Sequence, residues 1–367
     1  MKYYIIAGEA SGDLHASNLV KGLFAEDPQA VVRAWGGPKL REAGAEVVHD
    51  YRGNDVMGIS DTVSRAGSIV SSLHRCKADI LDFAPDAVVL VDYPGFNLRI
   101  AKFAHRKGLR VFYYIAPKTW ATRPWRNKRL RAWVDRLFIV FPFEKDYFGK
   151  VGVPYSYVGN PLLDAVDSHV FNPVCEEPYV ALLPGSRKGE IERMMPVCKK
   201  LAHSLWCKLI IAGAPNRTKA DYEPYLEGEK NIEVVFDRTY DVLKGAKAAV
   251  VNSGTASLEA ALTGTPQVVC WSGSRLTAWI ARKVLHVFDH IKYISLANLI
   301  LDKQIFTELV QEDFTYENLE AEVSTLLGSE ERRKAMAEDY ARLREVLGGS
   351  GASRYAATEM IKEIKHI

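Results

Sequence analysis

Short apolar runs alternate with amphipathic helical patterns along almost the whole chain, and this alternation constrains the fold more than any other feature. Strands that alternate with helices favour parallel sheets covered by helices on both faces. The runs fall into two series: Tyr3–Ala7, Val31–Trp35, Ala87–Val91, Arg110–Ile115, Arg136–Val140 and Tyr155–Val158, then Tyr179–Leu183, Lys208–Ala212, Ile232–Phe236, Ala248–Val251 and Val268–Trp271. We therefore predict an α/β protein with two Rossmann-like domains, each built on a doubly wound parallel sheet.

Two domains also suit a chain of 367 residues. The segment from Asn160 to Pro178 separates the two series, contains three prolines and lacks clear periodicity. We therefore predict domains at 1–165 and 166–345.

The composition excludes several classes of function. A formal net charge of +3 is too weak to indicate nucleic acid as a partner. The five cysteines form no CxxC pair and the nine histidines have no metal-ligand spacing, so we expect no metal and no cofactor. No apolar run approaches the ~20 residues that span a bilayer, and the N-terminal run is too short for a signal peptide. We expect a cytoplasmic protein that is at most peripheral to a membrane.

In an open parallel sheet, ligands bind beyond the carboxyl ends of the strands. The segment Ala248–Trp271 reads as strand, turn, helix and strand, with Ser253, Gly254 and Thr255 at the start of the helix. Free amides and the helix dipole favour an anion there. Glu259, one turn further, would repel a phosphate but accept hydrogen bonds from a ribose. The pattern indicates a nucleoside diphosphate site, and an ordinary βα turn capped by serine or threonine is the alternative.

A second loop of the same half has similar chemistry. The strand Tyr179–Leu183 leads into Gly185, Ser186 and Arg187, and a helix follows from about Glu190. The Gly-Ser amides and a permanently charged, bidentate guanidinium suit a diphosphate. The alternative is an arginine in a surface loop.

Two strand ends of the first half carry acids. Asp13 is predicted to cap the first helix, whereas Glu9 has no such role and is a candidate functional acid; Ser11 is a candidate substrate-binding residue. Asp92 follows five apolar residues, and partial burial would raise the pKa of its carboxyl group. Asp92 is therefore a candidate general base, with a turn-capping aspartate as the alternative.

Two further segments suggest a surface role. Lys118–Arg136 holds seven basic residues and three tryptophans. This mixture is typical of a nucleic-acid surface, an interfacial membrane patch or an anionic headgroup site, and a solvated amphipathic helix is the structural alternative. Met57–Leu73 is mildly apolar and is expected to be either a segment that contacts membrane or acyl chains, or a core helix.

The ordered set of motifs resembles the lipid-A-disaccharide synthases, glycosyltransferase family 19. The matching segments are GEASGD (8–13), GGP (36–38), VMGI (56–59), DYPGFN (92–97), Pro117 with Trp120, FPFEK (141–145), LPGSR (183–187), SGTASLE (253–259) and SLANL (295–299). The resemblance implies a GT-B architecture with an interdomain cleft, a C-terminal domain that binds the UDP-sugar, an N-terminal domain that binds the acceptor, and a last helix, about 346–367, that packs back on the first domain.

The resemblance also implies the reaction and the roles of individual residues. UDP-2,3-diacylglucosamine and 2,3-diacylglucosamine 1-phosphate would give a β-1,6-linked disaccharide 1-phosphate and UDP, without a metal, at the inner-leaflet surface on the cytoplasmic face of the inner membrane. Asp92 matches the family's proposed base and Glu9 an essential acid. Arg187, Glu259 and Asn298 match positions that contact UDP.

Other readings stay open at the level of sequence. The protein would otherwise be another GT-B UDP-sugar transferase, a UDP-sugar epimerase, or a non-catalytic protein that binds nucleotide or lipid. The last of these would be expected to have lost Asp92 or Arg187, and both are present. The sequence does not exclude a homodimer.

Overall fold

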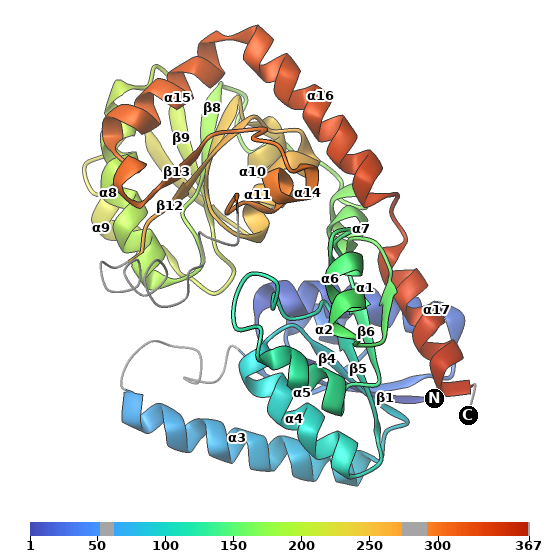
Figure 1. The fold of residues 1–367 in the computed structure, drawn as a ribbon. Helices are drawn as coiled ribbons and strands as arrows, with labels where there is room; N and C mark the ends of the chain where they lie inside the picture. The colour runs from blue at the N-terminus through green and yellow to red at the C-terminus, as the bar shows by residue number, and fades with distance from the viewer. Residues whose placement is uncertain (52–61, 274–291, 366–367) are drawn as a thin grey trace. The chain divides into compact units, whose positions relative to one another are not determined.

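The computed structural model describes residues 1–51, 62–273 and 292–365, and the chain forms two compact units. Unit 1 comprises Met1–Ala165 with Gly348–Ile367, and unit 2 comprises Val166–Leu347. Each unit is one parallel sheet flanked by helices (Figure 1). The predicted α/β class, with two doubly wound parallel sheets, is confirmed.

The sheet of unit 1 has the order β3-β2-β1-β4-β5-β6-β7, and every neighbouring pair is parallel. The strands are β1 (Lys2–Ala7), β2 (Val31–Gly36), β3 (Glu46–Asp50), β4 (Ala87–Val91), β5 (Arg110–Tyr114), β6 (Arg136–Ile139) and β7 (Tyr155–Tyr157). The central strands are continuous apolar runs because helices bury both of their faces.

Side chains of unit 1 alternate between the two faces of this sheet. Tyr4 and Ile6 pack in one core cluster with residues of α3, α4 and α5, whereas Tyr114 lies on the other face near Ser353 of α17. The helices are α1 (Ala10–Glu26), α2 (Pro38–Glu42), α3 (Thr62–Phe83), α4 (Pro94–Arg106), α5 (Arg126–Trp133), α6 (Glu144–Val151), α7 (Pro161–Asp167) and α17 (Ala352–Lys365).

Helix α17 lies beside α1 in unit 1, although the two are far apart in sequence (Figure 1). A Cβ atom at Gly22 would lie 3.0 Å from Cα of Arg354 and 3.1 Å from the Ser353 carbonyl oxygen, so glycine permits this close crossing. The start of α17 is fixed by Asp164, whose carboxylate accepts a hydrogen bond from the Ser353 amide at 2.8 Å. The end of the chain therefore completes unit 1.

The sheet of unit 2 has the order β10-β9-β8-β11-β12-β13 and is also parallel throughout. Its strands are β8 (Tyr179–Leu183), β9 (Lys208–Gly213), β10 (Ile232–Phe236), β11 (Ala248–Asn252), β12 (Gln267–Trp271) and β13 (Glu308–Val310). Its helices are α8 (Lys188–Ser204), α9 (Glu223–Leu226), α10 (Thr239–Gly245), α11 (Thr255–Thr263), α14 (Leu296–Leu301), α15 (Tyr316–Gly328) and α16 (Glu330–Leu347), with 3₁₀ turns η2 (Lys219–Asp221) and η3 (Gln311–Asp313).

The prediction that Asp13 caps its own helix is wrong. Helix α1 begins at Ala10, with Glu9 at the N-cap position, so Asp13 lies inside the first turn. The Asp13 carboxylate is buried and accepts hydrogen bonds from the amides of Gly37, Lys39 and Leu40, at 2.8, 3.0 and 3.2 Å. Asp13 therefore caps α2, because the end of β2 returns beside the start of α1.

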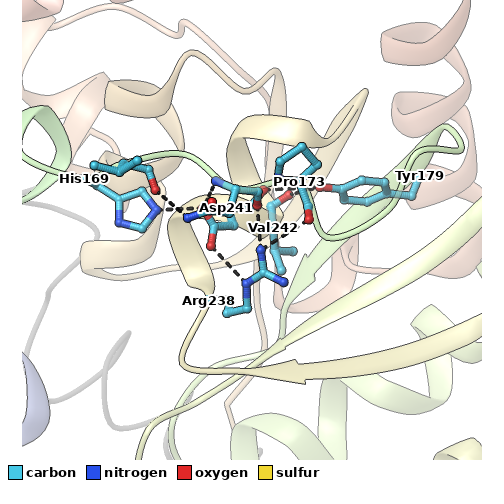
Figure 2. Close-up of polar contacts among 8 residues, drawn as sticks. His169, Pro173, Tyr179, Arg238, Asp241 and Val242 are labelled. Atoms are coloured by element: carbon cyan, nitrogen blue, oxygen red, sulfur yellow. Dashed lines mark hydrogen bonds and ion pairs between the residues drawn. The ribbon is translucent and has the colours of Figure 1, made fainter.

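The segment that enters unit 2 is tied to helix α10 by Asp241 (Figure 2). The buried Asp241 carboxylate contacts His169 Nε2 at 2.7 Å and accepts a hydrogen bond from Arg238 Nε at 3.0 Å. Arg238 also donates to the carbonyls of Asn172 and Pro173. These bonds fix α10, whose Tyr240 reaches the candidate site described below.

Across residues 1–51, 62–273 and 292–365, no helix is both long enough and apolar enough to cross a membrane. Part of the predicted segment Met57–Leu73 lies outside the described residues. Its described end forms the start of α3, where Leu73 packs in the core and Val70 is exposed.

Candidate functional site

Glu9 and Asp92 lie at the point of unit 1 where the strand order reverses. The chain runs from β1 outward to β2 and β3, then returns to β4 on the other side of β1. The register pairs Ala7 with Val91, so the residues that follow these two strands emerge side by side. Open α/β sheets bind their ligands at such a switch point.

The backbone at Asp92 has an unusual conformation. Asp92 and Tyr93 both have positive φ angles, 43° and 44°, a region that costs about 1–3 kcal/mol for each residue that is not glycine. Buried Asn97 holds this turn, since its amide group donates to the carbonyls of Asp92 at 2.8 Å and Val91 at 3.1 Å. Tyr113 OH also donates to the Asp92 carbonyl. The turn is thus held through the backbone carbonyls of Val91 and Asp92.

Gly8 is required beside this turn. A Cβ atom at Gly8 would lie 2.4 Å from Cδ1 of Tyr93, so only glycine lets the Tyr93 ring pack here. The same ring borders an apolar pocket of about 40 Å³, lined also by Trp35 and Phe96.

The half-buried Asp92 carboxyl has a pKa of about 6, well above its ordinary value. Burial is the largest cause, and the negative charge of Glu9 adds to it. The positive charges of Lys118 and Arg126 act in the opposite direction. A base whose pKa lies near neutrality is matched to proton abstraction from a hydroxyl.

We expect the pH dependence of kcat/KM to show an ascending limb near pH 6. Asp92 must be ionised to act as a base, and at pH 5 only about a tenth of a group with this pKa is ionised. Glu9→Gln removes a charge that raises the pKa, so it should shift the limb to lower pH. Lys118→Gln removes a charge that lowers the pKa, so it should shift the limb to higher pH.

Stopped assays over pH 5–8 would measure these profiles. The assignment of the ascending limb to Asp92 would be contradicted if Glu9→Gln and Lys118→Gln shifted its midpoint pH in the same direction. It would also be contradicted if neither variant shifted that midpoint.

The exposed Glu9 side chain lies beside Ser11, whose hydroxyl donates to it at 3.1 Å. Glu9 makes no side-chain cap for α1. Contact of Ser11 with substrate stays a prediction.

Sequence reasoning did not assign a role to Glu144, the acid of the FPFEK motif. Glu144 follows β6 at the same edge of the sheet, is 1% exposed, and accepts hydrogen bonds from the amides of Val140 and Phe141 and from Trp120 Nε1. Burial raises the pKa of Glu144 to about 7, while these hydrogen bonds and Lys118 act to lower it. Glu144 thus anchors the loop that carries Lys118, and its place after a strand was the signal available in the sequence.

The basic, tryptophan-rich segment is only partly helical. Trp120 packs edge-to-face on Phe143, with ring centroids 4.9 Å apart, and Trp133 packs against the core of unit 1. Trp125 is 56% exposed. The structural alternative, an amphipathic helix, applies only to Arg126–Trp133, which forms helix α5.

In unit 2 the two predicted phosphate loops are neighbours. They follow β8 and β11, which pair with each other where the strand order reverses. Asn252 joins the loops, since its side chain donates to the Pro184 carbonyl at 3.3 Å. Gly185 has φ +102°, and a Cβ atom there would lie 2.3 Å from Nδ2 of Asn252, so glycine is required.

The amides of Ser186 and Arg187 are hydrogen-bonded within the loop. Both donate to Oε2 of Glu190 at 3.1 Å, and the Arg187 guanidinium contacts Oε1 of the same side chain at 2.8 Å. The Arg187 side chain is nevertheless 71% exposed, so its guanidinium can reach a ligand. Glu190 is a residue that sequence reasoning missed, and a diphosphate bound to these amides would have to displace its carboxylate.

The start of helix α11 has no side-chain cap, as an anion site requires. Gly254 is the N-cap residue and has a positive φ of 156°. The hydroxyl of Ser253 donates to the Ile294 carbonyl at 3.4 Å. Glu259, one turn beyond Thr255, accepts a hydrogen bond from Tyr240 OH at 3.1 Å. Burial raises the pKa of Glu259, and the bond from Tyr240 lowers it.

Asn298 is fully buried, and its side chain is engaged within unit 2. The amide group donates to the Phe306 carbonyl at 3.1 Å and to Glu308 at 2.9 Å, and its oxygen accepts from the Ile305 amide at 2.9 Å. These bonds give Asn298 a structural role that links α14 to β13. Its direct contact with UDP stays a prediction.

Comparisons with known proteins agree on one family. The chain matches the family described as lipid-A-disaccharide synthetase over residues 3–364. The lipid-A-disaccharide synthase of Syntrophus aciditrophicus is 38% identical over 376 residues, which cover 98% of this chain and 97% of that protein. The lipid-A-disaccharide synthase of Geobacter metallireducens is 38% identical, with 96% and 94% covered.

Solved structures share the fold at low sequence identity. The UDP-GlcNAc 2-epimerase of Neisseria meningitidis, bound to UDP-GlcNAc, has a TM-score of 0.69 at 14% identity and covers 99% of this chain and 100% of its own. A kitacinnamycin glycosyltransferase has a TM-score of 0.65 at 17% identity, with 99% and 98% covered. These likenesses confirm the predicted GT-B type of fold.

Proposed function

This chain belongs to the lipid-A-disaccharide synthase family, and we propose that it transfers 2,3-diacylglucosamine from UDP-2,3-diacylglucosamine to the 6-hydroxyl of 2,3-diacylglucosamine 1-phosphate. It is a glycosyltransferase of lipid A biosynthesis. The products are a β-1,6-linked disaccharide 1-phosphate and UDP. The observation that supports this assignment best is the Asp92 carboxylate at the switch point, with a pKa of about 6.

Asp92 acts as the general base. Its carboxylate takes the proton of the acceptor 6-hydroxyl while the hydroxyl oxygen attacks the anomeric carbon of the donor. The bond from that carbon to the diphosphate oxygen breaks on the opposite face, so the anomeric configuration inverts. Burial is the largest cause of the raised Asp92 pKa, and the negative charge of Glu9 adds to it.

Unit 2 binds the donor and stabilises the leaving diphosphate. The exposed Arg187 guanidinium and the uncapped start of α11 supply positive charge to it. A helix terminus contributes only about 0.3–2 kcal/mol, so Arg187 and the positioning of both substrates supply most of the effect. Ser186 lies in the phosphate loop that follows β8, and Ser253 lies in the one that follows β11. Glu259 accepts hydrogen bonds from the ribose.

Both substrates are lipids, so the enzyme works at a membrane surface. We infer a peripheral association with the cytoplasmic face of the inner membrane, supported by the basic loop that carries exposed Trp125. The apolar pocket beside Gly8 offers a contact for an acyl chain. Association into a homodimer stays a prediction.

The epimerase alternative is not favoured. The chain shares 38% identity with the two lipid-A-disaccharide synthases named above, whereas the UDP-GlcNAc 2-epimerase of Neisseria meningitidis shares 14% and shows the fold alone.

Product analysis in the presence of EDTA tests this proposal. The two lipid substrates in detergent should give UDP and a disaccharide 1-phosphate whose linkage, read by NMR, is β-1,6. We expect the rate to be unchanged by EDTA because the positive charge comes from Arg187 and a helix start. An α-linkage, a linkage to another hydroxyl, or dependence on added Mg²⁺ would contradict it.

A further inference from the structure

A strongly basic pocket of about 380 Å³ lies between helices α4 and α5 of unit 1. Its cationic residues, which define the basic pocket below, are Arg99, Lys102, Arg123, Arg126 and Arg129. Leu98 and Trp133 add apolar lining, and Lys102 lies 5.5 Å from the Trp133 ring centroid. The proposed mechanism above makes no use of this pocket.

The charge of the basic pocket is not balanced within the described part of the chain. None of its five cations forms an ion pair with a described residue, although most of the other arginines whose side chains are described in unit 1 do. Burial is the largest cause that lowers the pKa of Arg126. The positive charges of Arg123 and Arg129 lower this pKa further, because like charges repel. Five positive charges around the basic pocket repel one another, and this repulsion costs free energy. A bound anion would offset that cost.

The basic pocket adjoins the candidate base. Pro94 and Gly95 line the pocket, and they follow Asp92 and Tyr93 directly at the start of α4. Arg126 is close enough for its charge to act on Asp92. The start of this 13-residue helix also turns its positive dipole end toward the pocket.

The ligand that suits these groups is a phosphate monoester, which has about −1.5 to −2 charge at pH 7. The planar guanidinium of an arginine donates two parallel hydrogen bonds to a pair of phosphate oxygens. A single carboxylate would satisfy fewer of the donors in this pocket. Resting on the proposed function, we propose that the basic pocket binds the 1-phosphate of the acceptor while the acceptor 6-hydroxyl lies at Asp92. C1 and C5 flank the ring oxygen of a glucosamine and C6 is attached to C5, so one sugar presents the 1-phosphate and the 6-hydroxyl along the same edge.

The experiment compares the acceptor with its analogue that lacks the 1-phosphate, in detergent without phospholipid. The wild-type protein should show a KM for the analogue about a hundredfold higher, the equivalent of two charged hydrogen bonds. Arg99→Gln and Arg129→Gln should each raise the KM of the phosphorylated acceptor about tenfold. Both should leave kcat, the donor KM and the KM of the analogue unchanged.

Lys128→Gln is the matched control, because Lys128 is exposed on α5 between two pocket residues but does not line the pocket. It should change none of these constants. Equal effects of Arg99→Gln and Arg129→Gln on both acceptors, or no effect on either, would overturn the proposal.

Two further experiments distinguish this proposal from binding of a phospholipid headgroup and from failure of the proposed function. Vesicles of equal parts phosphatidylethanolamine and phosphatidylglycerol test the headgroup source. If the variants lose vesicle binding but still prefer the phosphorylated acceptor, the pocket holds a phospholipid headgroup and the proposal is wrong.

Calorimetry with glucosamine 1-phosphate tests the pocket without turnover. If glucosamine 1-phosphate binds and its affinity depends on Arg99 and Arg129, the phosphate-binding role of the basic pocket is supported even where transfer fails. If transfer occurs but this affinity does not depend on Arg99 and Arg129, the role of the basic pocket is rejected and the proposed function stands.

Discussion

Asp92→Asn should lower kcat/KM by about a thousandfold, within the range for loss of a general base. Asparagine has the same shape but cannot take the proton of the acceptor hydroxyl. The turn should survive, because Asn97 and Tyr113 hold it through the Asp92 carbonyl. UDP affinity, measured by calorimetry, should not change, because the nucleotide is assigned to unit 2.

Asp86→Asn is the control for this variant. Asp86 is exposed just before β4, at the amino end of the strand that leads to Asp92, and accepts a hydrogen bond from the Lys2 amide at 2.7 Å. It should retain nearly full activity. If Asp92→Asn turned over within a few-fold of the wild-type rate, another group would have to be the base.

Arg187→Ala should lower kcat/KM by about a hundredfold or more, as loss of one group that stabilises transition-state charge does. UDP should also bind more weakly, because the diphosphate loses a bidentate partner. Arg187→Lys should recover only part of the activity, since an ammonium cannot reproduce the planar fork. Melting temperature should change little, because the ion pair with Glu190 is exposed on the arginine side.

Lys188→Ala provides the comparison. Lys188 is the next residue, its side chain is 70% exposed, and it lies 3.9 Å from Glu192 on the same helix. Its removal should leave both rate and UDP affinity unchanged. Similar losses in both variants would mean that charge on this surface, rather than a specific contact of Arg187, supports activity.

The strand pattern made most of the fold predictable. Buried parallel strands such as Ala87–Val91 are continuous apolar runs, and the acids or glycines that end them mark the ligand edge of the sheet. Asp92, Glu9 and Arg187 were accessible to this reasoning because each directly follows a strand or its loop. The motifs then indicated the family, which the relatives confirm.

The features that were missed depend on tertiary contacts. Strand β13 has three residues, too few to show a period, and β3 pairs across an irregular register. Asp13 caps a helix 25 residues later, and Glu190 occupies the amides expected to face a ligand. Asn298 illustrates the same limit, because its three hydrogen bonds reach residues around β13. No local pattern specifies which distant donor a buried polar group will meet.

The most direct test of the central claim is UDP release from UDP-2,3-diacylglucosamine, measured with and without 2,3-diacylglucosamine 1-phosphate. A transferase that uses Asp92 on the acceptor hydroxyl should release UDP only when the acceptor is present, with one disaccharide formed for each UDP. Release of UDP, or epimerisation of the donor, at the same rate without acceptor would contradict the account.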